Sequence, residues 1–147
     1  MMQRLPLFLR LVAVVLVASG ALACQTMQDP LDSRGDFEEM QRNFTQHIRW
    51  GHIEEAAAFV VEDQRSEFLD LAPDLSDVRF TSYEILDVVH GKGLDTATVE
   101  VKYTGYRLSW PIEKTVKVRQ EWSREKGPWQ VRLELTKIRK ALALAAS

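Results

Sequence analysis

Residues 98–105 read TVEVKYTG, and apolar and polar side chains alternate along this stretch without interruption. Successive side chains of a β-strand point to opposite faces of its sheet, so the pattern predicts a strand with one buried and one solvent-facing side. Val99, Val101 and Tyr103 are expected on the buried side and Lys102 on the solvent side. Gly105 inside such a pattern indicates a bulge or a bend.

The segments on either side of this stretch repeat the alternation. It runs through residues 78–89 before it and through residues 116–122 and 129–135 after it. Turn-forming residues separate these segments, with GKG at 91–93 and KGP at 126–128. The second half of the chain therefore predicts a meander of about four antiparallel strands.

The chain before these strands has the spacing of helices. Four apolar residues recur at intervals of three or four and so share one helical face: Phe37, Met40, Phe44 and Ile48. Asp36 is expected to cap this helix and Gly51 to end it. Shorter helices are predicted over residues 52–61 and from Asp63 to a stop before Pro73. Two to three helices followed by a bent antiparallel sheet indicate an α+β fold with the helices packed on one face.

Two segments carry a resemblance to a known superfamily. They are WGHIEEAA at residues 50–57, at the first helix junction, and EWSREKGPWQV at residues 121–131, in the final hairpin. With this order of elements, residues 36–136 resemble the nuclear transport factor 2-like superfamily, a cone-shaped fold shared by ketosteroid isomerases and polyketide-cyclase-like proteins. The resemblance implies a cone whose interior holds a ligand or a catalytic site.

The first 23 residues differ from the rest of the chain. Arg4 and Arg10 precede an apolar run over residues 11–23, and no acidic residue occurs before Asp29. This layout is typical of a secretory signal peptide. A permanent anchor helix is the alternative, but a spanning helix needs about 20 apolar residues, and this one would have to include Arg10.

The end of that segment, GALAC at residues 20–24, resembles the lipobox of bacterial lipoproteins. Ala21 stands where Leu is most frequent in that motif, and the same residues fit an ordinary A-x-A cleavage site. Cys24 is the sole cysteine of the chain, which favours lipid attachment there. By resemblance to enterobacterial lipoproteins, Gln25 after the cysteine points to the outer membrane, facing the periplasm.

These patterns divide the chain into four parts. Residues 1–23 are the predicted signal peptide, 24–35 a lipidated tether, 36–136 the folded domain and 137–147 a C-terminal tail. The tail has two open interpretations, a terminal helix or a frayed end.

The resemblance directs the search for chemistry to the cone interior. Tyr83, Tyr103 and Trp110 are candidate ligand-binding residues there. An isomerase or cyclase would need a base, for which Asp87 is the weak candidate, with Tyr103 as hydrogen-bond donor. The favoured alternative is that Asp87 lies half solvated near the strand end. The sequence has no metal-ligand spacing and no glycine-rich phosphate loop, so it indicates neither a metal nor a cofactor.

Charge is unevenly distributed. Residues 24–101 carry six Lys or Arg against seventeen Asp or Glu, whereas residues 102–147 carry eleven against four. Four bases alternate with apolar positions and are expected on the solvent face of the sheet: Lys102, Lys117, Arg119 and Arg132. They are candidates for docking an anionic envelope component or an acidic protein partner. The alternative is that these charges are only solvated, or pair with acids within the fold.

The sequence thus predicts a membrane-anchored protein of the cell envelope that acts as a non-catalytic binding or interaction module. One alternative is a carrier of a small apolar ligand in the cone, and a weaker one is an isomerase or cyclase. A homodimer is left open. Nucleic acid is not an expected partner, because the chain has a net charge of −2 and its bases are mixed with acids.

Overall fold

A computed structural model describes residues 30–144 of the chain. The predicted signal peptide, Cys24 and the first half of the predicted tether lie outside these residues. Within the described part, no helix is both long enough and apolar enough to cross a membrane.

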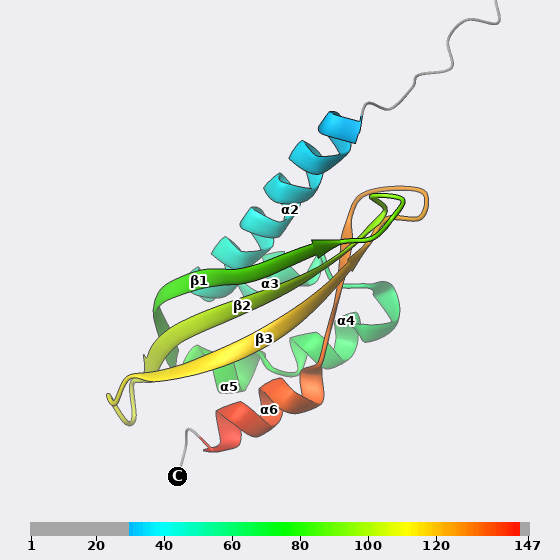
Figure 1. Cartoon of the computed structure of the whole chain (residues 1–147). Helices are drawn as coiled ribbons and strands as arrows, with labels where there is room; N and C mark the ends of the chain where they lie inside the picture. Colours follow the sequence, from blue (N-terminus) through cyan, green and yellow to red (C-terminus); the bar gives the residue numbers. More distant parts are fainter. Residues whose placement is uncertain (1–29, 145–147) are drawn as a thin grey trace, which may run out of the picture.

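Residues 30–144 form five helices and four strands (Figure 1). In chain order they are α2 (Pro30–Trp50), α3 (Ile53–Ala57), α4 (Glu62–Leu69), α5 (Ala72–Ser76), β1 (Val78–His90), β2 (Thr96–Arg107), β3 (Lys114–Ser123), β4 (Gln130–Leu133) and α6 (Leu135–Leu144). The strands form one antiparallel sheet in the order β1-β2-β3-β4, and the helices gather on one of its faces (Figure 1). The predicted α+β class and four-stranded meander are confirmed.

The register of β2 follows the alternation of its sequence. Val99, Val101 and Tyr103 are buried, while Lys102 between them is only partly covered. Tyr103 lies opposite Tyr83 on β1 and Val116 on β3. The middle of the sheet therefore presents one apolar face to the helices, as predicted.

Gly105 lies where β1 is irregular. It pairs with Phe80, and the register shifts between Phe80 and Ser82. A Cβ atom at Gly105 would lie 2.5 Å from the carbonyl oxygen of Arg79. β2 itself runs through Gly105 without a register shift, so the bulge or bend predicted at Gly105 is wrong and the extra residue lies in β1. The close approach of the two backbones explains the glycine.

The first helix differs from the prediction at its start and matches it at its end. α2 begins at Pro30 and not after Asp36, because proline suits a first helical turn and the single Gly35 costs a helix only about 1 kcal/mol. The part of the predicted tether from residue 30 onward is thus helical. At the other end Gly51 has φ +75°, and the His52 N–H donates to the His47 carbonyl at 2.9 Å. This is the expected glycine stop.

The core joins the helices to the sheet through aromatic side chains. Phe44 of α2 packs edge-on against Trp122 of β3, with ring centroids 5.7 Å apart, and Phe37 meets Trp122 at 5.9 Å. Val60, after α3, forms a parallel bridge with Val131 of β4. Two interpretations of the C-terminal tail were open, and the structure shows the helix. This helix, α6, is part of the domain, because Leu135 and Leu142 are buried.

Candidate functional site: the cone beneath helix α6

A small apolar cavity lies inside the cone, between the inner face of the sheet and the helices. Its volume is about 60 Å³, and its wall includes Phe44, Phe68, Val118, Ile138 and Leu142. One water molecule needs roughly 10–15 Å³ of such space, so the cavity can hold a small group but not a ligand of steroid size. The helices and the sheet have largely filled the cone.

Helix α6 closes this cavity and takes part in a second one. The second cavity, of about 40 Å³, shares Phe80, Tyr103, Val116, Ala141 and Leu142 with the first. It extends to Trp110 and Ile112 in the loop between β2 and β3. The two spaces together lead from the centre of the cone, past α6, towards the surface.

The inner end of the cone is polar but uncharged. Gln120 of β3 is fully buried; its Nε2 atom donates to the Tyr103 hydroxyl at 3.4 Å, and its Oε1 atom accepts from Trp122 Nε1 at 3.0 Å. From α2, Gln41 Nε2 donates to Thr45 Oγ1 at 3.0 Å and to Gln120 Oε1 at 3.4 Å. These amides and hydroxyls satisfy one another, as buried polar groups must.

Tyr103 is held in its neutral form by its surroundings. Burial raises the pKa of its hydroxyl far above the ordinary value for tyrosine, outweighing the hydrogen bonds from Thr45 and Gln120, which act in the opposite direction. The hydroxyl is therefore protonated at neutral pH. It can donate or accept a hydrogen bond to a bound group, and Gln120 holds it in place.

The other predicted cone residues lie outside the cavity centre. Tyr83 is half buried, receives a hydrogen bond from Gln46 Nε2 at 3.3 Å, and lines a groove between α2 and β1. Trp110 is 53% exposed and lies at the mouth of the second cavity. Of the three candidates, Tyr103 alone is deep in the cone.

Asp87 is not brought to Tyr103. A register shift between Ile85 and Asp87 takes Asp87 out of phase with Tyr83, and it lies opposite Glu100 with its side chain exposed. The hypothesis of Asp87 as base and Tyr103 as donor required a regular strand that turns Asp87 inward; that placement is wrong, and the catalytic role itself stays a prediction. The solvated position favoured from the sequence agrees with the structure.

The four predicted partner-binding bases each lie beside an acid. Lys102 pairs with Glu84, Lys117 with Glu100 at 3.3 Å, Arg119 with Glu121 at 3.5 Å and Arg132 with Asp63 at 2.8 Å. This is the alternative in which charges meet within the fold. Each of these four bases therefore has a neighbouring acid that offsets its charge, and docking of an anionic partner stays a prediction.

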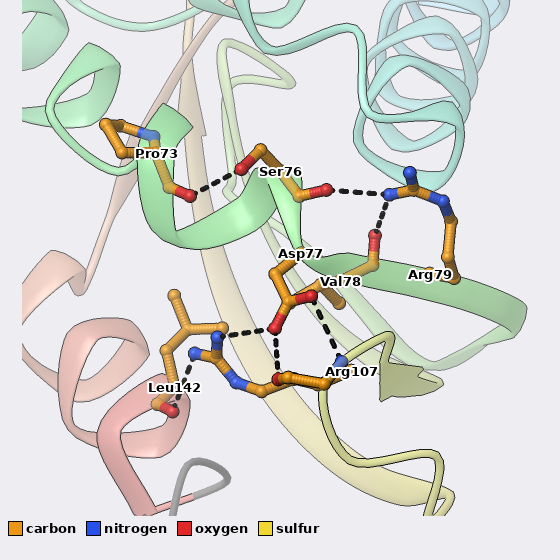
Figure 2. Close-up of polar contacts among 8 residues, drawn as sticks. Pro73, Ser76, Asp77, Val78, Arg79, Arg107 and Leu142 are labelled. Carbon is orange, nitrogen blue, oxygen red and sulfur yellow. Dashed lines mark hydrogen bonds and ion pairs between the residues drawn. The ribbon is translucent and has the colours of Figure 1, made fainter.

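A second polar cluster, not predicted from the sequence, fixes the mouth of the cone. Asp77, between α5 and β1, accepts hydrogen bonds from Ser109 Oγ at 2.5 Å and from the Ser109 N–H at 3.2 Å. Arg107 lies 3.5 Å from Asp77 and donates to the Leu142 carbonyl of α6 at 3.0 Å (Figure 2). The cluster thus ties the end of β2 and the loop after it to both α5 and α6.

Asp77 is ionised in this cluster. The hydrogen bond from the Ser109 hydroxyl, followed by the Ser109 N–H and Arg107, lowers the pKa of Asp77 below its ordinary value, against a smaller effect of burial. Nothing in the sequence pattern singles out Asp77 or Arg107, because their partners lie some thirty residues away along the chain.

Of the inner network, Tyr103 is a predicted site residue, whereas Gln41, Thr45 and Gln120 are not. Gln120 alternates in phase with Val118 and Trp122, and that phase is the one signal that could have placed its side chain inside. Within residues 30–144, no group of three or more His, Cys, Asp or Glu side chains is arranged to hold a metal ion.

No protein-family model matches the sequence, and no curated protein matches it. Solved structures are similar in shape. A SEC-C motif containing protein from Rhodopseudomonas palustris superposes with a TM-score of 0.54 at 13% identity, covering 65% of this chain and 74% of that one. A nuclear transport factor 2-like protein from Cytophaga hutchinsonii gives 0.51 at 13% identity, covering 67% and 91%.

A proposed polyketide cyclase from Xanthomonas campestris gives a TM-score of 0.50 at 14% identity, covering 75% of this chain and 98% of that one. Identities this low establish the fold and not the activity. The described part of the chain has the nuclear transport factor 2-like fold.

Proposed function

We propose that the protein is a lipid-anchored component of the bacterial cell envelope that acts by binding and not by catalysis. One observation carries the second part of the proposal. Among the described residues that line the central cavity, Tyr103 is the one ionisable group, and its raised pKa keeps it protonated. General acid–base chemistry needs a group with a pKa near the working pH.

The anchor is proposed on the sequence alone. A single cysteine directly after a basic, apolar and small-residue segment supports lipid attachment at Cys24, and Gln25 supports the outer membrane. Growth with labelled palmitate, followed by membrane fractionation, tests it. We expect label on the native chain and none on Cys24→Ser, whose membrane-bound fraction should be smaller. Label-free protein, or a signal segment retained in the mature mass, would contradict the anchor.

A carrier of a small apolar molecule is the second candidate, and the apolar cavity favours it. Its wall is almost entirely carbon. The small volume limits the ligand to a group such as a short acyl chain, unless α6 moves.

One measurement separates the two binding functions. The chain from residue 24 with Cys24→Ser retains the whole buried core, which lies within residues 37–142, and is suited to native mass spectrometry after gentle purification. A co-purified small molecule, lost in Val118→Phe, would establish the carrier. An unliganded mass favours a filled cone with a protein partner, and the same spectrum reports monomer or dimer.

An isomerase or cyclase activity has less support. The fold is shared with a proposed polyketide cyclase, but the one carboxylate considered as a base is exposed on β1. Turnover of an enolisable ketone that is abolished by Asp87→Asn would overturn the non-catalytic proposal.

A further inference from the structure

The loop between β2 and β3 places apolar side chains in solvent. Leu108, Trp110 and Ile112 are 53%, 53% and 54% exposed, and they alternate along five residues. Leucine and isoleucine at such positions cost free energy in water, and tryptophan is enriched where a protein meets a membrane surface. These three side chains are called the apolar tip below.

The backbone N–H groups of the apolar tip already have partners within the protein. The Leu108 N–H donates to the Asp77 carbonyl at 2.8 Å, and the Ser109 N–H donates to its carboxylate at 3.2 Å. The Trp110 N–H donates to Arg107 at 3.1 Å and the Ile112 N–H to Trp110 at 2.8 Å.

Pro111 has no N–H, so every backbone donor from 108 to 112 has a partner. A strand-like protein partner would need free backbone donors. Unpaired backbone donors are costly at a lipid surface, so such a surface favours a loop whose backbone N–H groups all have partners.

Two exposed bases lie in the turn of α6 that borders the second cavity. Ala141 and Leu142 of α6 line the same cavity as Trp110 and Ile112, and Arg139 and Lys140 precede them in the same helical turn with exposed side chains. Two acids near the tip keep their negative charge: Glu113 accepts a hydrogen bond from Thr81 Oγ1 at 2.7 Å, and Asp77 is partly offset by Arg107 at 3.5 Å. Apolar side chains flanked by bases suit a surface that contains anionic phospholipid.

We infer that the apolar tip is a membrane-contact site that enters the headgroup region of a phospholipid bilayer. The contact is additional to the lipid proposed at Cys24 and does not depend on it. Figure 1 places the loop at the end of the sheet opposite the start of α2. A lipid before α2 and a membrane-contact site at the opposite end of the sheet would together orient the long axis of the domain parallel to the membrane surface.

Vesicle binding tests the inference without the lipid. The chain from residue 24 with Cys24→Ser is sedimented with vesicles of phosphatidylethanolamine and phosphatidylglycerol. We expect binding, and a roughly tenfold or greater weakening in the triple variant Leu108→Thr, Trp110→Thr, Ile112→Thr. Neutralising Arg139 and Lys140 with Gln should weaken binding to these vesicles more than to phosphatidylcholine vesicles.

A matched control is available at the other end of the sheet. Leu86, Val88 and Val89 of β1 are also exposed apolar residues, and their triple threonine variant should bind vesicles like the parent. Circular dichroism and thermal unfolding establish that each variant is folded. The inference is overturned if the parent does not sediment with vesicles, if both triple variants bind equally, or if the tip is needed only to retain a protein partner.

Discussion

Gly105 has no room for a side chain, because a Cβ atom there would lie 2.5 Å from the Arg79 carbonyl oxygen and 3.0 Å from Phe80 Cα. Both are backbone atoms of the paired strand and cannot rotate away. Gly105→Ala should therefore lower the free energy of unfolding by about 1–3 kcal/mol in urea denaturation. Gly127→Ala is the control, since nothing lies within 4 Å of the added atom. Equal effects at the two positions would contradict the steric explanation.

Gln120 satisfies more than one buried group at once. In Gln120→Leu, Trp122 Nε1 loses its acceptor and the Tyr103 hydroxyl loses a donor, in a place without solvent. Leaving a buried polar group without a partner costs about 1–3 kcal/mol, so urea denaturation should show a loss of at least that size. A variant as stable as the parent would mean that the network contributes nothing to the fold.

The sequence predicts the positions of these residues better than their roles. Alternation places Val99, Val101 and Tyr103 inside because their side chains are apolar and in phase. The same rule treats a polar residue in phase as an exception, so Gln120 was not singled out. Asp87 is the opposite case: alternation predicts it on the buried face, but one register shift in β1 places it on the solvent face of the sheet.

The type and order of the helices and strands are predictable from the sequence, whereas the residues at which they begin and end are less so. The spacing of Phe37, Phe44 and Ile48 fixes α2, and all three are buried. Its start at Pro30 follows the local preference of proline for a first helical turn, whereas the helix at α6 depends on tertiary packing, which intrinsic preference does not contain. Within α6, Leu135 and Leu142 are buried, and Arg107 binds the carbonyl near its end.

The loop between β2 and β3 depends on the charge of Asp77. Because the pKa of Asp77 is lowered in the folded protein, its carboxylate stabilises the fold above its ordinary pKa, and this stability is lost as the pH falls through the lower, folded value. Asp77→Asn should thus be less stable than the parent near neutral pH, and the gap should narrow below about pH 4. Urea midpoints measured across pH 2.5 to 7 check this.

Ser109→Ala identifies the cause of that pH dependence. The Ser109 hydroxyl is the largest influence lowering the pKa of Asp77, so its removal should move the loss of stability to higher pH. An unchanged profile in Ser109→Ala would assign the effect to Arg107 instead.

At the scale of the whole molecule, the cone is full at one end and partly empty at the other. Aromatic rings of α2 and β3 fill the region around Phe44 and Trp122, whereas space remains beneath α6. The sequence predicts a cone but not how well it is filled, because packing depends on contacts among residues far apart in the chain. The Asp77 cluster is not predictable from the sequence for the same reason.

One substitution made at two valines tests this uneven filling. Val118 of β3 lines the central cavity, and Val99 of β2 is fully buried and lines none of the described cavities. The methylene added by Val118→Ile can enter the free space, contributing about 0.8 kcal/mol of apolar burial. In Val99→Ile it meets packed atoms and should cost about 1–3 kcal/mol. Urea denaturation should thus give opposite signs. A loss at both positions would mean that the space beneath α6 cannot accept even one methylene, which would also remove the carrier as a candidate function.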